Sequence, residues 1–426
     1  SYGPNLFGGL KGELPGYNNR LKESEYMESN TLFSNLNEIY LGLLPESLSW
    51  AAYLGTGFTI ILIVVNALLM LTAFGTYMER RVLGRFQTRL GPNRVGPFGL
   101  LQPLADLLKL IIKEDLRPVT ADRLTFFLAP VLMVTSMLVV VAVIPFGNGS
   151  FLADLNIGVL YLVGIPTIAT VSIFLGGWGS GNRFALLGAA RAVAMLISYE
   201  VPMIVSLAGV LILAGSMSLV EVVEAQRLPF ILLQPLAFFV FIVSASAEMN
   251  RSPFDLMEAE SELTAGFHTE FSGMRFGLVQ LAEFGEVVIT SAILSTLFLR
   301  GWENPFIPSD WQQVLPAQIW FIGKVLFFML IFTWIRATLP RMRIDQVMAF
   351  AWKVLFPLAL INMFVTAALV VVWPDPDPTY TQLWVMVGVN WAVAIGCLVC
   401  FTRGLERHGK KPTASVQLVQ MPAEVS

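Results

Sequence analysis

Long apolar segments without charged side chains are the feature that most limits how this chain can fold. Thirty consecutive residues, Ser49 to Met78, carry no charge, and similar segments recur along the chain. A helix needs about 20 mostly apolar residues to cross a lipid bilayer. Only 13% of the residues are charged, against about 25% in an average soluble domain. The net charge of −3 leaves no excess of basic residues. Together these values exclude a soluble enzyme and a nucleic-acid binder.

Nine apolar segments are long enough to span a membrane as helices. We therefore predict an all-α integral membrane protein with about nine transmembrane helices, one surface amphipathic helix after the first, and no internal repeat. The predicted spans are Ser49–Met78, Leu124–Phe146, Leu155–Gly177, Ala192–Gly215, Leu228–Ala247, Phe276–Leu299, Ala317–Ile335, Val354–Trp373 and Tyr380–Thr402.

Basic residues predict the orientation of these spans, because the cytoplasmic connections of membrane proteins are rich in Lys and Arg. Of 27 such residues, 21 lie in connections on one side or in the C-terminal tail. We expect residues 1–48 to form a polar lead outside the membrane. Residues 49–402 would form the membrane domain, and residues 403–426 a cytoplasmic tail.

The first inner connection combines arginines with a turn rich in Gly and Pro. It runs from Glu79 to Arg123 and contains Arg89-Leu-Gly-Pro-Asn-Arg-Val-Gly-Pro97. After this turn, apolar residues recur at helical spacing, so we expect an amphipathic helix at about 98–114 on the membrane surface. Simple anchoring by positive charge remains an alternative to a functional role for these arginines.

The most acidic connection covers about 248–275. Ser252 and Pro253 are typical of a helix start, and the acids that follow, at spacings of three and four, would share one helical face. Eight acids occur from Glu248 to Glu286. Clustered carboxylates in a poorly hydrated place cannot all ionise, so some would take up protons near neutral pH. A solvated acidic loop is the alternative.

Four ionisable residues fall inside predicted spans, namely Glu200, Glu283, Glu286 and Lys324. A charge at the bilayer centre costs at least about 2.5–3.5 kcal/mol, so such residues usually face a wet cavity or a partner. We interpret them as part of a proton path from the inner surface toward mid-membrane. An ion pair between Lys324 and one of the acids is the alternative.

The histidine and cysteine content argues against a redox centre in this chain. There are two His and two Cys residues, whereas a b-type haem usually takes paired axial ligands and an iron–sulfur cluster four thiolates. We predict no metal site and no catalytic residue here. Cys397 and Cys400 are interpreted as small buried residues, with a redox pair as the alternative. His268 in the acidic connection is expected to form ordinary hydrogen bonds.

Several long motifs, in one order, resemble the H subunit of respiratory complex I. The resemblance covers about Trp50 to Val372, roughly three-quarters of the chain. Its motifs are Glu79-Arg-Arg-Val-Leu-Gly84, Gly91-Pro-Asn93, Gly96-Pro-Phe-Gly-Leu-Leu-Gln-Pro-Leu-Ala-Asp106, Ile197-Ser-Tyr-Glu-Val201, the stretch Glu248–Leu263, His268-Thr-Glu270 and Trp334–Gln346.

The resemblance implies roles for particular residues along a tunnel for a hydrophobic quinone. It assigns four residues to the tunnel mouth and its lining: Glu79, Arg80, Arg89 and Asp106. It assigns six residues to the quinone cavity: Arg251, Asp255, Glu258, Glu260, Glu262 and Glu270. The acids that would link the cavity to proton translocation are Glu200, Glu248 and Glu283.

The resemblance further implies a quinone-tunnel and proton-coupling subunit of an NADH:quinone oxidoreductase in the bacterial inner membrane. Quinone would be the substrate. FMN and iron–sulfur clusters are expected on partner subunits, which would include soluble quinone-site and iron–sulfur subunits and antiporter-like membrane subunits. The alternatives are the membrane anchor of a related ion-translocating hydrogenase and a stand-alone ion transporter. The N-terminal lead and Glu286 depart from the family pattern, and the ninth helix resembles bacterial members.

Overall fold

The regular structure of this chain is helical. The computed structural model describes residues 30–43, 48–255, 265–303, 316–373 and 379–409. Within them there is no β-strand, only one isolated bridge in a loop, and eight helical segments are long and apolar enough to cross a membrane. The predicted all-α membrane class is therefore confirmed. The eight are α3 (Ser49–Phe86), α5 with its 3-10 extension (Arg123–Val143), α6 and α7 (Gly158–Gly164 and Pro166–Gly179), α8 (Arg183–Ala214), α13 (Gly273–Phe298), α15 (Ala317–Thr338), α16 to α17 (Ile344–Val372) and α18 (Tyr380–Gly409).

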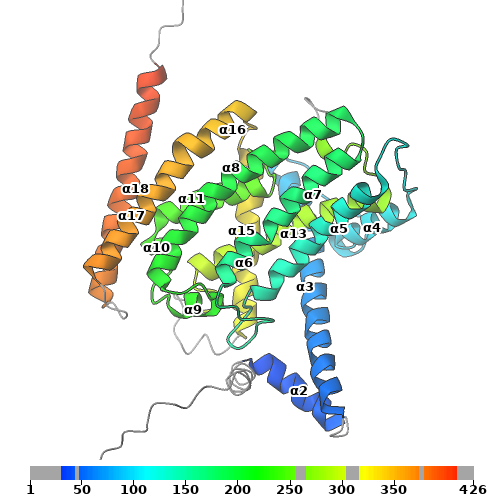
Figure 1. Cartoon of the computed structure of the whole chain (residues 1–426), viewed down its shortest axis with the longest axis horizontal. Coiled ribbons are helices and arrows are strands. Elements are labelled where there is room, and N and C mark those ends of the chain that lie inside the picture. Colours follow the sequence, from blue (N-terminus) through cyan, green and yellow to red (C-terminus); the bar gives the residue numbers. More distant parts are fainter. Residues whose placement is uncertain (1–29, 44–47, 256–264, 304–315, 374–378, 410–426) are drawn as a thin grey trace, which may run out of the picture.

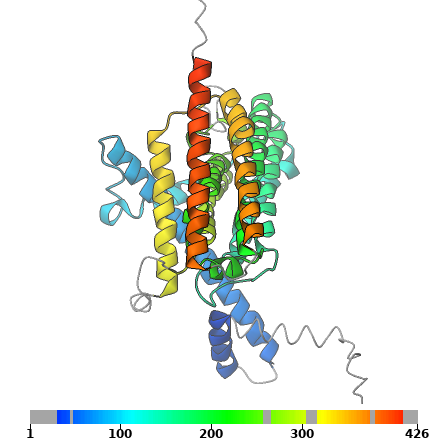
Figure 2. The ribbon, with the colours of Figure 1, turned by 90° about the vertical axis from the view of Figure 1, so that its left-hand side faces the viewer.

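Helix α13 forms the centre of the bundle. In the apolar 18-residue stretch of α13, 78% of the residues are buried, against 17–50% in the corresponding stretches of the other candidate spans. It packs against α3, α5 and α15. In Figure 1, α3, α15 and α18 run nearly vertically, while α5, α7 and α8 cross the view obliquely. Figure 2 shows α18 lying in front of the bundle when its left-hand side faces the viewer. Helices from distant parts of the sequence therefore converge on α13.

The fifth predicted span is interrupted. The segment Leu228–Ala247 contains α10 (Phe230–Leu233) and the 14-residue α11 (Pro235–Glu248), with Gln234 outside both. The residue before a proline avoids the α conformation, and Gln234 adopts φ −133° and ψ 66°. The predicted single helix is wrong at this point, because Pro235 starts a new helix.

Hydrogen bonds connect this interruption to two other helices. Asn390 Nδ2 and Trp391 Nε1 of α18 donate to the carbonyls of Leu233 and Leu232, at 2.7 and 3.1 Å. Gln234 Nε2 donates to the carbonyl of Gly209 in α8 at 2.8 Å. Irregular backbone at membrane depth is tolerated where its polar groups find such partners. The interruption thus connects α8, α11 and α18.

Two predicted connections are partly helical. Helix α3 continues to Phe86, so Glu79 and Arg80 lie on a helix rather than in a loop. Helix α8 starts at Arg183, nine residues before the predicted span, and therefore includes Arg191. Polar residues at the ends of these two helices continue the helix beyond the apolar segment. Boundaries predicted from hydropathy alone therefore ended α3 too early and started α8 too late.

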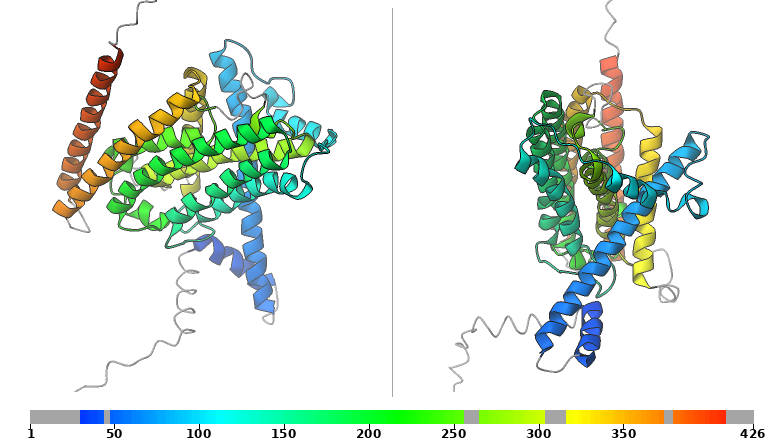
Figure 3. Two further views of the ribbon diagram at one scale, coloured as in Figure 1. Left: turned by 45° about the horizontal axis from the view of Figure 1, so that its top comes forward. Right: turned by 90° about the vertical axis from the view of Figure 1, so that its right-hand side faces the viewer.

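The amphipathic helix is confirmed in a shorter form. Helix α4 covers Gln102–Ile112 after a 3-10 turn at Pro97–Gly99, in which Gly96 and Gly99 have positive φ angles. No residue of α4 is buried. Three of its leucines and both isoleucines are exposed on the side of the bundle, where α4 projects in Figure 3, and Leu110 is half-buried.

The polar lead contributes helix α2 (Thr31–Leu43), which packs on the first turns of α3. Tyr40 and Thr59 share a hydrogen bond of 2.8 Å, and Asn30 Nδ2 donates to the carbonyl of Phe151 at 2.8 Å. Figure 1 shows α2 at the end of the molecule opposite to the C-terminal end of α18.

Lys324 closes the C-terminal end of α13 rather than pairing with an acid. Its ammonium group, carried by α15, donates to the carbonyls of Leu299 and Gly301, each at 2.7 Å, and to that of Glu303. A cation at a helix C-terminus also complements the helix dipole. The predicted alternative of an ion pair with one of the intramembrane acids does not hold for this residue.

Cys397 and Cys400 do not fit the expectation of two buried residues. Both are free thiols on α18, Cys397 half-buried and Cys400 exposed. Helix α18 lies at the edge of the bundle, which explains their accessibility.

Close packing of α7 on α8 depends on Gly177. A Cβ atom there would lie 2.4 Å from Ala189 Cβ and 2.8 Å from the carbonyl oxygen of Ala185. We expect Gly177→Ala to lower the free energy of unfolding by about 1–3 kcal/mol through overpacking. Gly164→Ala, where no atom lies within 4 Å, is the matched control. Thermal unfolding in detergent measures both, and equal stability of the two variants would contradict this packing.

Replacement of Lys324 by Met tests its contact with α13. The variant keeps the apolar stem but leaves three carbonyls without their donor, and we expect a loss of about 2 kcal/mol or more. Lys109→Met, on the exposed face of α4, should leave the melting temperature unchanged. A wild-type melting temperature for Lys324→Met would refute this role.

Candidate functional site

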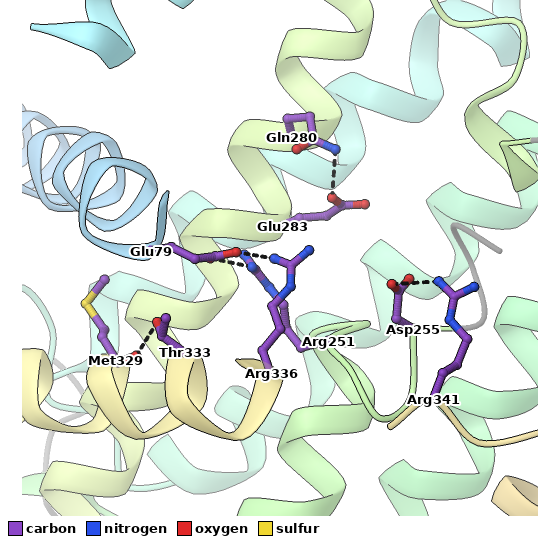
Figure 4. A network of polar contacts seen from close by, with 9 residues as sticks. All are labelled: Glu79, Arg251, Asp255, Gln280, Glu283, Met329, Thr333, Arg336 and Arg341. Carbon is purple, nitrogen blue, oxygen red and sulfur yellow. Dashed lines mark hydrogen bonds and ion pairs between the residues drawn. The ribbon is translucent and has the colours of Figure 1, made fainter. Parts of the chain in front are cut away.

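A buried carboxylate lies between two guanidinium groups at one end of the bundle. Glu79, on the last turns of α3, accepts a hydrogen bond from Arg251 at 2.5 Å through Oε2 and one from Arg336 through Oε1. Arg251 follows α11 and Arg336 lies near the end of α15. Figure 4 shows the two arginines converging on Glu79. One side chain therefore ties together three elements that are far apart in sequence.

Local backbone geometry aims Arg251 at Glu79. Asn250 has a φ angle of 51°, a left-handed conformation that Asn tolerates and that commonly ends helices. The Arg251 guanidinium lies 4.4 Å from the centre of the Phe284 ring on α13, which adds a cation–π contact. Glu79 and Arg251 are each only 8% exposed. An ion pair buried to this degree is stable only with further favourable contacts, which Arg336 and the Phe284 ring supply here.

A second ion pair joins the connection after α11 to the connection after α15. Arg341 donates to Asp255 Oδ2 at 2.8 Å, and the backbone N–H of Met342 donates to the carbonyl of Pro253 at 3.1 Å. In Figure 4 this pair lies beside the Glu79 cluster. The Asp255 side chain is largely buried, whereas Arg341 is half-exposed.

The four residues predicted for the tunnel mouth lie in two different places. Arg80 pairs with Asp106 of α4 at 2.5 Å, and Arg80 and Arg89 line an open pocket of about 410 Å³ with Leu83 and the Gly91–Pro92 turn. Burial opposes ionisation of Asp106, but hydrogen bonds from Arg80 and Gln102 outweigh it and hold its pKa below the ordinary value. Glu79 instead joins Arg251 and Arg336.

The acidic connection is described only at its two ends. Glu270 accepts a hydrogen bond from Asn182 Nδ2 at 2.8 Å, and Asn182 also caps the start of α8. Glu258, Glu260 and Glu262 lie outside the described residues.

His268 is buried at the second of these ends. Its ring lies 5.2 and 5.6 Å from the rings of Phe267 and Phe276. Burial lowers its pKa below the ordinary value, although the charge of Asp255 acts in the opposite direction. Among the described residues no group of three His, Cys, Asp or Glu side chains is arranged to hold a metal ion.

The intramembrane acids come from three helices. Glu200 lies on α8, Glu248 is the last residue of α11, and Glu283 lies on α13, where Gln280 Nε2 donates to it at 3.1 Å. Glu286 lies one turn further along α13. A cavity of about 50 Å³ is lined by Glu248 and Glu286, and not by Glu200 or Glu283.

Arg336 is a site residue that the sequence analysis did not single out. Its guanidinium group shares the Glu79 carboxylate with Arg251. Arg336 and Glu79 are 257 positions apart, so no local pattern could pair them.

The comparisons with known proteins agree with this architecture. Residues 58–367 match the family model described as NADH dehydrogenase. The chain belongs to the NADH dehydrogenase family. It is 50% identical over 327 residues to the H subunit of the NADH-quinone oxidoreductase of Dehalococcoides mccartyi (strain CBDB1), covering 77% of this chain and 89% of that protein. The corresponding H subunit of Thermomicrobium roseum is 48% identical, with 73% and 94% covered. The first of the numbered H subunits of Geobacter metallireducens is also 48% identical, with 72% and 94% covered.

Glu79→Gln tests the buried cluster of this family member. The change leaves the buried guanidinium of Arg251 and the half-buried guanidinium of Arg336 without their carboxylate. We expect this loss to lower the free energy of unfolding by roughly 3–5 kcal/mol. Asp255→Asn should cost less, because its partner Arg341 is more exposed. Denaturation of both variants in detergent measures the difference, and the reverse order would contradict our assignment of Glu79 as the central contact.

The burial of His268 predicts a pH dependence. Because the folded protein binds the imidazole proton less readily than the unfolded chain, whose pKa is near 6.5, stability should fall as the pH drops below about 6.5. His268→Asn should flatten this dependence between about pH 7 and pH 5. Thermal melts at a series of pH values measure it, and an identical slope in the variant would overturn the prediction.

Proposed function

We propose that this chain is the quinone-tunnel and proton-coupling membrane subunit of an NADH:quinone oxidoreductase. The observation that carries the proposal is the buried Glu79 cluster, found in a chain whose relatives at 48–50% identity are named as H subunits of NADH-quinone oxidoreductase. In this function the chain holds no redox centre of its own. It shapes the path of the quinone and responds to its reduction.

The charged end of the bundle supplies groups that can sense a change of charge in a nearby quinone. Glu79 with its two arginines and Asp255 with Arg341 form adjoining ion pairs. Reduction of a quinone creates demand for two protons, and pairs of this kind redistribute charge when a neighbour changes charge. We assign Arg80, Arg89 and Asp106 to the tunnel mouth, because they line the open pocket or bind a residue that does.

The remaining cavity acids are assigned by the family resemblance. These are Glu258, Glu260, Glu262 and Glu270, together with Arg251, which also binds Glu79. Glu200, Glu248 and Glu283 would carry the response into the membrane. Their positions support this role: α13 packs against α3, Arg251 follows α11 in the chain, and α8 packs against α11.

The orientation follows from the distribution of charge. We propose that the lead 1–48 lies outside, that residues 49–402 form the membrane domain, and that the tail 403–426 is cytoplasmic in a bacterial inner membrane. The opposite positions of α2 and the C-terminal end of α18 support opposite sides for the two termini. The partners would be soluble quinone-site and iron–sulfur subunits carrying FMN and clusters, and small and antiporter-like membrane subunits.

The relatives' names favour this function over the two alternatives. They name a quinone-linked oxidoreductase, neither a hydrogenase anchor nor a transporter. A hydrogenase anchor needs no quinone site, and a transporter needs no partner subunits.

Purification through a tag on this chain tests the function. We expect a multisubunit assembly that reduces quinone with NADH and is blocked by a quinone-site inhibitor. Asp255→Asn should assemble normally but reduce quinone at least about tenfold more slowly, because a charge next to the reacting group is lost. Glu224→Gln, an exposed acid on α9 (Leu219–Glu224), is the control. Hydrogen evolution without quinone reduction, or ion transport by the chain alone, would refute the proposal.

A further inference from the structure

A small, partly open cavity lies between two carboxylates that come from different helices. Helices α5, α6, α7, α8, α11 and α13 surround a space of about 50 Å³, with Glu248 on one side and Glu286 on another. Ser136 of α5 and Thr290 of α13 add hydroxyl groups to walls that are otherwise apolar. The cavity is therefore a polar spot within an apolar bundle.

The size and lining of the cavity suit a few water molecules. One water needs roughly 10–15 Å³ of space open to its centre and two to four polar partners, so this cavity holds on the order of three. Glu248 and Glu286 are each half-buried although both lie deep in the bundle, because the cavity makes part of their surface accessible. Waters there can bridge the two carboxyl groups.

No cation within the described residues forms an ion pair with Glu248 or Glu286. Arg251, whose charge acts on Glu286, already binds Glu79 and lies over the ring of Phe284. Two adjacent negative charges in a poorly hydrated place are costly, and sharing a proton through water lowers this cost. The pair is thus suited to binding and passing a proton rather than to holding the fold together.

We propose that Glu286 is a proton-carrying residue that exchanges protons with Glu248 through water in this cavity. The proposal rests on the proposed function and adds an acid that the family resemblance does not include. A proton received by one carboxylate passes through water to the other, which is then protonated. The first carboxylate has regained its starting state, and the second regains it when it releases the proton to the next acceptor. Glu283, one turn earlier on α13, bonds to Gln280 outside this cavity.

Met137 of α5 packs directly on Gly285 of α13, the residue before Glu286. A Cβ atom on Gly285 would lie 2.1 Å from Met137 Sδ, so glycine is what lets Met137 pack directly beside Glu286. Met137 also lines the cavity. The glycine therefore allows α5 and α13 to approach closely next to the cavity.

Glu286→Gln in the whole purified assembly, reconstituted in liposomes, tests this role. We expect normal assembly and an initial rate of proton pumping lowered by roughly tenfold or more, as is typical for loss of a positioned proton-transfer group. Glu286→Asp, which keeps a carboxyl group, should recover a large part of the rate, a rescue that a purely structural role would not give. Glu224→Gln, exposed on α9, should pump like the wild type.

The double variant Glu248→Gln/Glu286→Gln distinguishes one shared path from two separate effects. Acids in one path should be non-additive, so the double variant should pump about as fast as the slower single variant. Wild-type pumping by Glu286→Gln, or no rescue by Asp, would overturn the proposal while leaving the proposed function intact. Absence of quinone reduction in the wild-type assembly would instead refute the proposed function.

Discussion

The carboxylate of Glu79 is the contact on which one end of the helical bundle depends. It holds Arg251 and Arg336, and through them the ends of α3, α11 and α15. A buried charge of this kind is tolerated only with good geometry and full hydrogen bonding, which the turn at Asn250 and the ring of Phe284 help to provide. Because these pairs adjoin Asp255 and Arg341, a change of charge beside one of them alters the balance of the others (Figure 4).

Polar side chains within the membrane domain have two kinds of surroundings. Lys324 and Gln234 bind backbone carbonyls and fasten helix ends, so their role is architectural. Glu248 and Glu286 face a cavity and form no ion pair within the described residues. Hydropathy treats all four alike, since each is an expensive residue in an apolar segment. Only the contacts separate residues that hold helices together from those that can exchange protons.

The sequence predicted the helical membrane class and most spans, because long apolar segments have few other solutions. It predicted one helix where Pro235 starts a second, and it ended α3 before Glu79. The first error overlooked a local signal, because Pro235 itself starts the new helix. The second error concerns Glu79, whose carboxylate is paired by the distant Arg251 and Arg336. The charged connections were recognised from composition and motifs, but pairings across more than 150 residues leave no local signal.

Labelling with a photoreactive quinone tests most directly the claim that the Glu79 end of the bundle borders the quinone path. In the purified assembly, we expect labels on peptides from the C-terminal end of α3, the segment Arg251–Asp255 or the C-terminal end of α15, and competition by unlabelled quinone. Labels confined to α2, α9 or the C-terminal end of α13, in an assembly that still reduces quinone with NADH, would contradict this claim.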